Sequence, residues 1–452
     1  MGGRHGTALR ATARGRRGVA GRPVLAAALG LGTVLTALTA LTAQPARAAG
    51  QDTTHDYAFA ADARRIEGAG STADAGRLEP GRTYRSTLPP DGKVYYRLDL
   101  DDTSTAYVSA TAVPPTGSGV SVADGVKVTL EDSDGRSCDV DTAPFGAPAS
   151  PHPVAAWAMR EISPRRSLCA EAGTYYVTVE RASPDARGAS PDPWELEIGT
   201  VSEPGTTTPD GTAAPEAWDS ATPAPVQGTA QRRAGGAGFA QAAPLGEGVW
   251  RDDIRPGQTL FYEVPVDWGR RLHVTAELGS SGTDATGYVA SALTLDLYNP
   301  VRGLVEDLSV GYDGGQKSKA LKPLPPVAYE NRHASGQQVS AVRFAGSYYL
   351  VAHLSPEVAE DFGDGPVPLT LRVRLGGAAQ DRPDYAGGTV PSDVFTVDGG
   401  PGGPATGGGG TAGDATLYRV LAAGGIGTGS ALVVGLGVWT AVARRRGAAL
   451  SE

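Results

Sequence analysis

The sequence is poor in the side chains that carry most enzyme chemistry. Its 452 residues include two cysteines, two methionines and six histidines, and aromatic residues make up 6%. The sequence contains no histidine pair at zinc-binding spacing, no G-x-S-x-G elbow, no P-loop and no strand-linked G-x-G-x-x-G. These absences exclude the best-marked metalloproteases, lipase-like hydrolases and nucleotide-binding enzymes. We therefore expect a protein without catalytic residues or a cofactor.

Acidic residues outnumber basic ones between the two ends of the chain. Seven arginines precede residue 48 with no acid among them, and three more lie at 444–446. The chain between them holds thirty basic and forty-eight acidic residues, which leaves a net charge of −18. A surface of that charge repels nucleic acid and anionic lipid. We therefore exclude nucleic acid as a partner and expect the charge to serve solubility.

The N-terminus has the three parts of a secretory signal. Residues 1–23 are rich in arginine and lack acids, residues 24–43 are apolar, and Ala46 and Ala48 form a small-x-small cleavage site. We expect residues 1–48 to be a signal peptide; an uncleaved N-terminal anchor is the alternative. A twin arginine in the basic part leaves the Tat route open beside the Sec route.

The C-terminus has the pattern of a single membrane anchor. Residues 420–443 carry no charge over 24 residues, which is long enough for a helix to cross a hydrocarbon core of about 30 Å. Arg444, Arg445 and Arg446 follow at once, and such residues stay in the cytoplasm. We expect them to act as a stop-transfer signal that begins a cytoplasmic tail at 444–452. The preceding chain then lies outside the cytoplasmic membrane.

Two segments have the composition of linkers. Residues 200–235 are rich in Pro, Thr, Ala and Gly, and residues 377–416 include the run GGPGGPATGGGGTAGDAT. Such segments are extended and flexible. The first is expected to join two domains, and the second to be a stalk that holds them off the membrane.

Similar blocks of sequence lie on either side of the first linker. The segment YRSTLPPDGKVYYRLDL at 84–100 matches WRDDIRPGQTLFYEVPV at 250–266, and AGTYYVTV at 172–179 matches AGSYYLVA at 345–352. Further matches keep the same order. This predicts a tandem duplication.

Each block, at 67–199 and 236–376, has the pattern of short β-strands. Val94, Tyr96 and Leu98 alternate with polar or surface residues, and Gly and Pro interrupt the apolar runs. Where two tyrosines are adjacent on a strand, one ring is expected in the core and one on the outer face. The fold class predicted is all-β, with two tandem antiparallel β-sandwiches.

The two cysteines, Cys138 and Cys169, both fall in the first block. A secreted chain meets an oxidising environment, so we expect a structural disulfide, which would contribute about 3 kcal/mol by closing its loop. The matching positions in the second block are Val305 and Val342, which predicts that both positions are interior. Two free buried thiols are the alternative.

One acidic cluster has the oxygen-rich composition of a calcium site. Asp132, Asp134, Asp139 and Asp141 lie within ten residues, and carboxylates are ligands that Ca²⁺ prefers. Their spacing does not match an EF-hand loop, and the second block has no such cluster. A solvated turn is the preferred interpretation, and we expect no bound metal.

Each block resembles the bacterial pre-peptidase C-terminal domain. The likeness lies in GKVYYRLDL, LTLDLYNP and AGTYYVTV and in their counterparts, which occur in order in both blocks. It implies jelly-roll-like β-sandwiches that act as non-catalytic accessory modules, some of which bind substrate or calcium. The blocks depart from the family in carrying inserts at 135–168 and 303–340, and no peptidase domain accompanies them. No binding residue is carried over.

These features predict a single-pass membrane protein of the cell surface that binds or scaffolds an envelope protein or polysaccharide. An accessory subunit of an envelope or secretion complex is the alternative. A surface hydrolase is a further one, and it requires a deep polar cleft with paired acids in one block.

Overall fold

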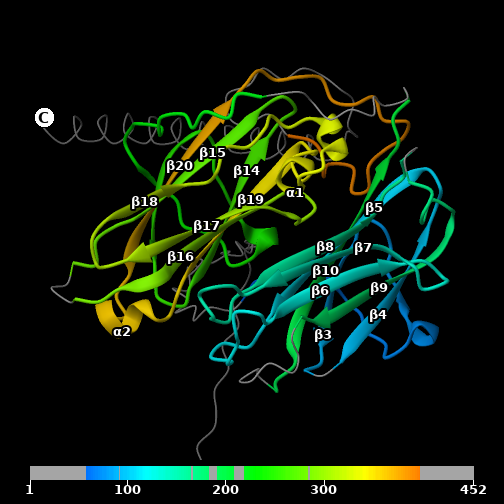
Figure 1. Cartoon of the computed structure of the whole chain (residues 1–452), viewed down its shortest axis with the longest axis horizontal. Coiled ribbons are helices and arrows are strands. Elements are labelled where there is room, and N and C mark those ends of the chain that lie inside the picture. Colours follow the sequence, from blue (N-terminus) through cyan, green and yellow to red (C-terminus); the bar gives the residue numbers. More distant parts are fainter. Residues whose placement is uncertain are drawn as a thin grey trace, which may run out of the picture. The chain divides into compact units, whose positions relative to one another are not determined.

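The computed structural model describes residues 57–90, 92–163, 166–182, 191–207, 218–282 and 286–397. They form an all-β structure in which pairs of five-stranded sheets make two β-sandwich-like domains (Figure 1). The predicted fold class is confirmed at this level. Both sandwiches fall within one compact unit.

The first sandwich is built from ten strands. In one sheet the order is β1-β3-β10-β5-β8, and in the other it is β2-β4-β9-β6-β7. Pairing is antiparallel except for β1 with β3 and β2 with β4. The strands are β1 (Arg64–Arg65), β2 (Gly76–Arg77), β3 (Thr83–Leu88), β4 (Lys93–Leu100), β5 (Ser104–Val113), β6 (Gly125–Glu131), β7 (Ser137–Pro144), β8 (Val154–Arg160), β9 (Gly173–Arg181) and β10 (Trp194–Pro204).

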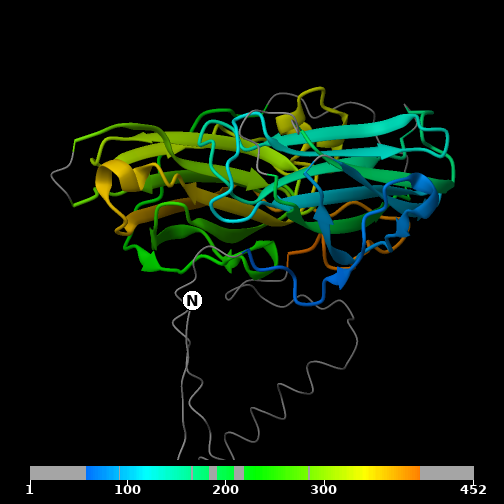
Figure 2. The ribbon, with the colours of Figure 1, turned by 90° about the horizontal axis from the view of Figure 1, so that it is seen from below.

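The second sandwich repeats this strand order. Its sheets run β11-β13-β20-β15-β18 and β12-β14-β19-β16-β17, and Figure 2 shows the layers of both sandwiches from below. The strands are β11 (Gln231–Arg232), β12 (Ala243–Pro244), β13 (Gly248–Ile254), β14 (Thr259–Val266), β15 (Arg271–Leu278), β16 (Val289–Tyr298), β17 (Leu304–Tyr312), β18 (Lys317–Ala320), β19 (Gly346–Leu354) and β20 (Val367–Gly376).

Helices are short in the described residues. The α-helices are α1 (Gln337–Ser340) and α2 (Val358–Phe362), and the 3₁₀ turns are η1 (Thr72–Asp74), η2 (Phe239–Gln241) and η3 (Tyr329–His333). No helix of the described ranges has the length and apolar character that crossing a membrane requires.

Alternating side chains fill the space between the two sheets of each sandwich. Val94, Tyr96 and Leu98 of β4 point inward and are buried, while Tyr95 remains half-buried on the outer face. Burying one such side chain stabilises the fold by about 1.5–3 kcal/mol. The same period-two alternation in β15 and β20 builds the core of the second sandwich.

The folded region extends beyond the boundaries expected for the linker and the stalk. Strand β10 continues to Pro204, because Glu203 packs inside the protein and accepts a hydrogen bond from Tyr385 Oη at 2.9 Å. The chain after β20 also packs back. Val390 pairs with Ser202, and Phe395 is buried. The first part of the expected stalk, through residue 397, is therefore folded.

The predicted disulfide is present. Cys138 and Cys169 are bonded, with Cα atoms 5.8 Å apart. Cys169 is buried, but Cys138 is only half-buried, because it lies near the start of β7 at the edge of its sheet. Val305 and Val342 are both buried. The expectation of two interior positions therefore holds for Cys169 alone in the first sandwich.

The acidic cluster divides into two structural roles. Asp139 and Asp141 accept hydrogen bonds from the backbone N–H groups of Met159 and Trp157 in β8, at 3.0 and 3.2 Å. Asp132 instead accepts bonds from its own turn. The interpretation as a solvated turn is therefore corrected for Asp139 and Asp141, whose carboxylates bind the free edge of the facing sheet. In the described ranges no cluster of three metal-ligating side chains occurs.

Several predictions concern residues outside the described ranges. These are the signal peptide at 1–48 with its cleavage residues Ala46 and Ala48, the anchor at 420–443, and the stop-transfer residues Arg444, Arg445 and Arg446.

Candidate functional site

The most elaborate packing outside the two cores lies between the sandwiches, at a surface that we call the junction. Here the outer face of the β1-β3-β10-β5-β8 sheet meets the outer face of the β12-β14-β19-β16-β17 sheet. Strand β5 is buried on both faces for this reason. Two apolar clusters contain residues of both sandwiches. They comprise Tyr57, Ala155, Phe239, Phe261, Tyr298 and Val351 in one, and Tyr107, Trp157, Val301, Phe344 and Phe395 in the other.

Two buried ion pairs cross the junction. Arg302 binds Glu197 at 2.7 Å and Arg332 binds Glu203 at 2.8 Å, with both carboxylates at most 1% exposed. Tyrosines supply further bonds to these acids. For example, Tyr107 Oη donates to Glu203 at 2.6 Å. Removing one partner of such a pair costs about 3–5 kcal/mol, because it leaves a buried charge without a partner.

The segment that precedes β1 also enters the junction. Tyr57 is buried, its hydroxyl donates to Glu197 at 3.0 Å, and its ring contacts Phe261 edge-on. The backbone N–H of Ala60 donates to the same carboxylate at 2.8 Å. Three separate parts of the chain therefore meet at Glu197.

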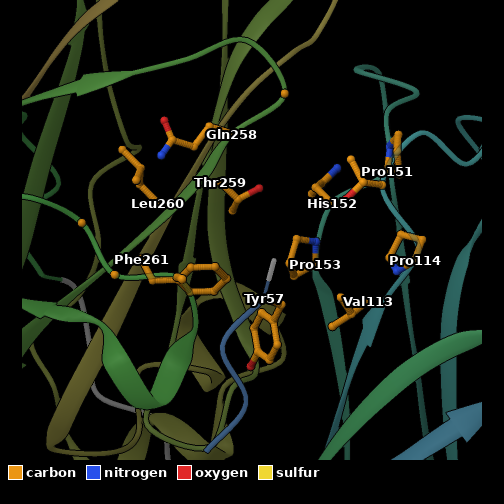
Figure 3. Close-up of a pocket in the computed structure, with 15 residues that line it drawn as sticks. Tyr57, Val113, Pro114, Pro151, His152, Pro153, Gln258, Thr259, Leu260 and Phe261 are labelled. Carbon is orange, nitrogen blue, oxygen red and sulfur yellow. The ribbon is translucent and has the colours of Figure 1, made fainter. Parts of the chain in front are cut away.

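A small cavity opens beside Tyr57 at the junction. Figure 3 shows Pro114, Pro151, His152 and Pro153 of the first sandwich on one side, and residues 258–261 of the second on the other. The cavity holds about 110 Å³. It is lined by Tyr57, Val113, Pro114, Thr116, Pro151, His152, Pro153, Gly235, Gly236, Ala237, Gly257, Gln258, Thr259, Leu260 and Phe261. Among the described residues, no acidic or basic side chain lines the cavity other than His152, which becomes charged when it takes up a proton.

A chain of hydrogen bonds runs behind the cavity wall. Ser150 Oγ and His353 Nε2 are 2.7 Å apart, and His353 Nδ1 lies 3.0 Å from Thr259 Oγ1. A serine beside a histidine is the start of a nucleophile and base pair. Here, however, a hydroxyl stands where such sites use a carboxylate, and Ser150 is 3% exposed and lies outside the cavity lining. The arrangement therefore suits a connection between the sandwiches better than nucleophilic attack.

One carboxyl group at the junction is held in an unusual state. Asp296 of β16 lies opposite Asp307 of β17. Burial, and then the neighbouring Asp307, raise the pKa of Asp296 to about 7. Tyr298, which is buried against Ala155 in the same cluster, provides a hydrogen bond. Near neutral pH this carboxyl is poised between its two protonation states.

The junction residues were not found by sequence reasoning. The predicted site residues that are described, Cys138 and Cys169, lie within the first sandwich and not at the junction. One signal was available. Strand β5 (STAYVSATAV) has no charged side chain on either face, as is expected of a strand buried on both sides.

No protein-family model matches the chain, and no curated protein does. Solved structures match only distantly. The CUB1-EGF-CUB2 domain of human MASP-1/3 is 10% identical, with a TM-score of 0.15, over 65% of this chain and 99% of that one. The CBM22-1-CBM22-2 tandem domain of Paenibacillus barcinonensis Xyn10C is 13% identical, with a TM-score of 0.18, over 67% and 86%. The tandem CBM51 modules of Streptococcus pneumoniae Sp3GH98 are 8% identical, with a TM-score of 0.17, over 65% and 83%. At such scores the likeness carries no argument about function.

Proposed function

We propose that this chain is a non-catalytic binding protein of the cell surface, anchored in the cytoplasmic membrane with both sandwiches outside. The observation that carries the binding role is the junction cavity, in which two sandwiches and the segment at Tyr57 form one recess. Polar groups lie beside apolar side chains in its lining, and its size suits a single small unit of a ligand rather than a whole drug-sized molecule.

The proposed location depends on the two ends of the sequence and on the disulfide. A signal peptide ending near Ala48 and the stop-transfer run 444–446 together give a single-pass topology with the sandwiches outside. The bond between Cys138 and Cys169 is of the kind that persists in oxidising compartments. We retain the resemblance of both blocks to jelly-roll-like pre-peptidase C-terminal domains, and their origin by duplication, as parts of the proposal.

The lining of the cavity suggests the chemistry of the ligand. Thr116, Gln258 and Thr259 offer neutral hydrogen-bonding groups, and Phe261 with the prolines offers apolar surface. A charged ligand would lose its hydration there without gaining an ion pair. We therefore propose an uncharged unit of an envelope polysaccharide or of an envelope protein as the ligand.

Site-specific crosslinking in intact cells tests this function. Thr116 is exposed at the cavity, so p-benzoylphenylalanine in its place should capture the ligand in the full-length protein. The same residue in place of Ser133, an exposed turn position of the first sandwich, is the matched control. We expect an adduct from position 116 only.

The nature of the adduct separates the alternatives. An adduct degraded by glycan-cleaving enzymes indicates a polysaccharide, and one degraded by protease indicates an envelope or secretion complex. Equal or absent adducts at both positions, with no binding to purified envelope material, would reject the binding role. Turnover of an envelope substrate by the purified protein would reject the non-catalytic role.

A further inference from the structure

Two stacked imidazoles join the sandwiches beside the cavity. His152 precedes β8 in the first sandwich, and His353 belongs to β19 in the second. Their ring centroids are 4.4 Å apart and their planes differ by 16°. Both rings are buried, with exposed fractions of 6% and 1%. A proton added to either ring therefore places a cation inside the junction.

The hydrogen bonds of His152 identify the atom that takes up this proton. Nδ1 lies 2.8 Å from the backbone carbonyl oxygen of Ser150. A carbonyl only accepts, so Nδ1 carries the hydrogen and donates. Nε2 of the neutral ring is therefore the basic atom. His152 lines the cavity, which gives it a route to solvent protons.

The groups around His152 do not compensate a positive charge. Its ring contacts the edge of Phe145 and stacks on the ring of His353, and neither neighbour is an anion. The facing residues are Gln258, just before β14, and Thr259, its first residue, and on β16 Thr294 pairs with His353. The titratable groups farther along are Tyr57, bonded to Glu197, and Asp296, which is two residues from Thr294.

Burial accordingly lowers the pKa of His152 to about 4, and the bond to Ser150 only partly opposes this effect. In the part of the chain that the structure describes, no charged side chain contributes to the shift. A histidine in water has a pKa near about 6.5. The closed junction therefore binds the proton more weakly than an open one.

We propose that His152 is an acid-sensitive latch, whose protonation loosens the contact between the sandwiches and opens the adjoining cavity. The proposal rests on the proposed function only in naming the cavity as the site that is regulated. By linkage, the ratio of the open form to the closed form rises up to about tenfold for each pH unit below about 6.5. This rise ends near pH 4, where His152 of the closed form also binds a proton.

Hydrogen exchange of the full-length protein tests the latch. Deuterium uptake in residues 57–60, where the N–H group of Ala58 bonds the carbonyl oxygen of Ala237 across the junction, is measured at pH 7 and pH 4.5 and is corrected for the chemical exchange rate. All proteins compared carry Asp296→Asn, because acid protonates the Asp296 carboxyl in the same range and would stabilise the closed junction. We expect acid to increase the corrected uptake of this segment at least tenfold. The His152→Gln variant, which cannot be protonated, should remove the increase. The His273→Gln variant is the matched control, because His273 lies on β15 away from the junction.

Two results would overturn the latch. One is an acid response that persists unchanged in His152→Gln, and the other is no response in the Asp296→Asn protein that retains His152. If the variant does not fold, titration of the His152 ring protons by NMR in the wild-type protein decides the matter. An apparent pKa at or above that of a free histidine contradicts the proposal. None of these readouts requires a ligand, so a failed ligand search leaves the latch testable.

Discussion

At the residue scale, the junction holds carboxyl groups in two different environments. Glu197 and Glu203 are each paired with an arginine and with tyrosine hydroxyls. Asp296 faces Asp307 instead, and burial with this neighbour raises its pKa to about 7. The second environment stabilises the protonated form of its carboxyl group.

The Asp296→Asn substitution tests the second environment. In the unfolded chain this carboxyl has its ordinary pKa of 3.8, so between that pH and about 7 the folded protein holds a proton that the unfolded chain has released. The free energy of unfolding contributed by Asp296 therefore falls as pH rises through this range. The amide mimics the protonated acid and does not titrate. Relative to wild type, we expect the variant to gain on the order of 3 kcal/mol between pH 4 and pH 7.5.

Denaturant unfolding of both proteins at several pH values measures this gain. His152 titrates in the same range with the opposite sign, but it is present in both proteins and cancels in the difference. A difference that stays constant with pH would show that the Asp296 carboxyl is ordinary.

At the element scale, the sequence predicted the features that depend on residues close together in the chain, such as which face of a strand is buried. The alternation of Val94, Tyr96 and Leu98 correctly placed β4 with one face inward, and the disulfide followed from a secreted chain with two cysteines. The end of β10 was missed, because Glu203 is polar and its burial depends on Arg332, which lies more than a hundred residues away. Composition alone placed the linker boundary inside this strand.

The valines that match the cysteines in the second block, Val305 and Val342, did not predict the backbone conformation at the disulfide. Cys169 has a positive φ of 60°, a conformation that favours glycine. Val342, its counterpart, does not have a positive φ. A β-branched side chain is poorly tolerated in that conformation. Local backbone geometry therefore differs between the sandwiches at this position.

Replacing the disulfide tests this difference. We expect Cys138→Ala with Cys169→Ala to lose about 3 kcal/mol of unfolding free energy, because the loop is no longer closed. Cys138→Ala with Cys169→Gly should recover about 1 kcal/mol of that loss, because glycine relieves the positive φ. Denaturant titration compares the two. Equal stability of the pairs, or a more stable alanine pair, would contradict the argument.

At the scale of the whole molecule, the two sandwiches use different faces to meet. The second uses the outer face that carries Phe261, and the first leaves the matching face, with Tyr95, half-exposed. The sequence aligned these two residues, but it did not show that only one of them is covered. Such pairing depends on which faces of distant strands come together, and the alternation within β4 and β14 does not show it.

Thermal unfolding of full-length variants tests this asymmetry. The wild-type sandwiches should unfold in one calorimetric transition, because buried ion pairs couple them. Phe261→Asp places a charge in the junction and should divide the transition into two. Tyr95→Asp makes the same change at the matched, half-exposed position and should leave one transition. Two transitions in the wild-type protein, or one in Phe261→Asp, would show that the junction does not couple the sandwiches.

The position of Tyr57 near the N-terminus also affects the order in which parts of the molecule fold. A chain is made from its N-terminus, so Tyr57 emerges before nearly everything that it contacts. Its hydroxyl partner, Glu197, follows 140 residues later, and Phe261 and Arg302 follow later still. The earliest described residue must therefore wait for the second sandwich before it is enclosed, and contacts of such long range form slowly. A ribosome-released fragment lacking the second sandwich would leave this segment open to proteases.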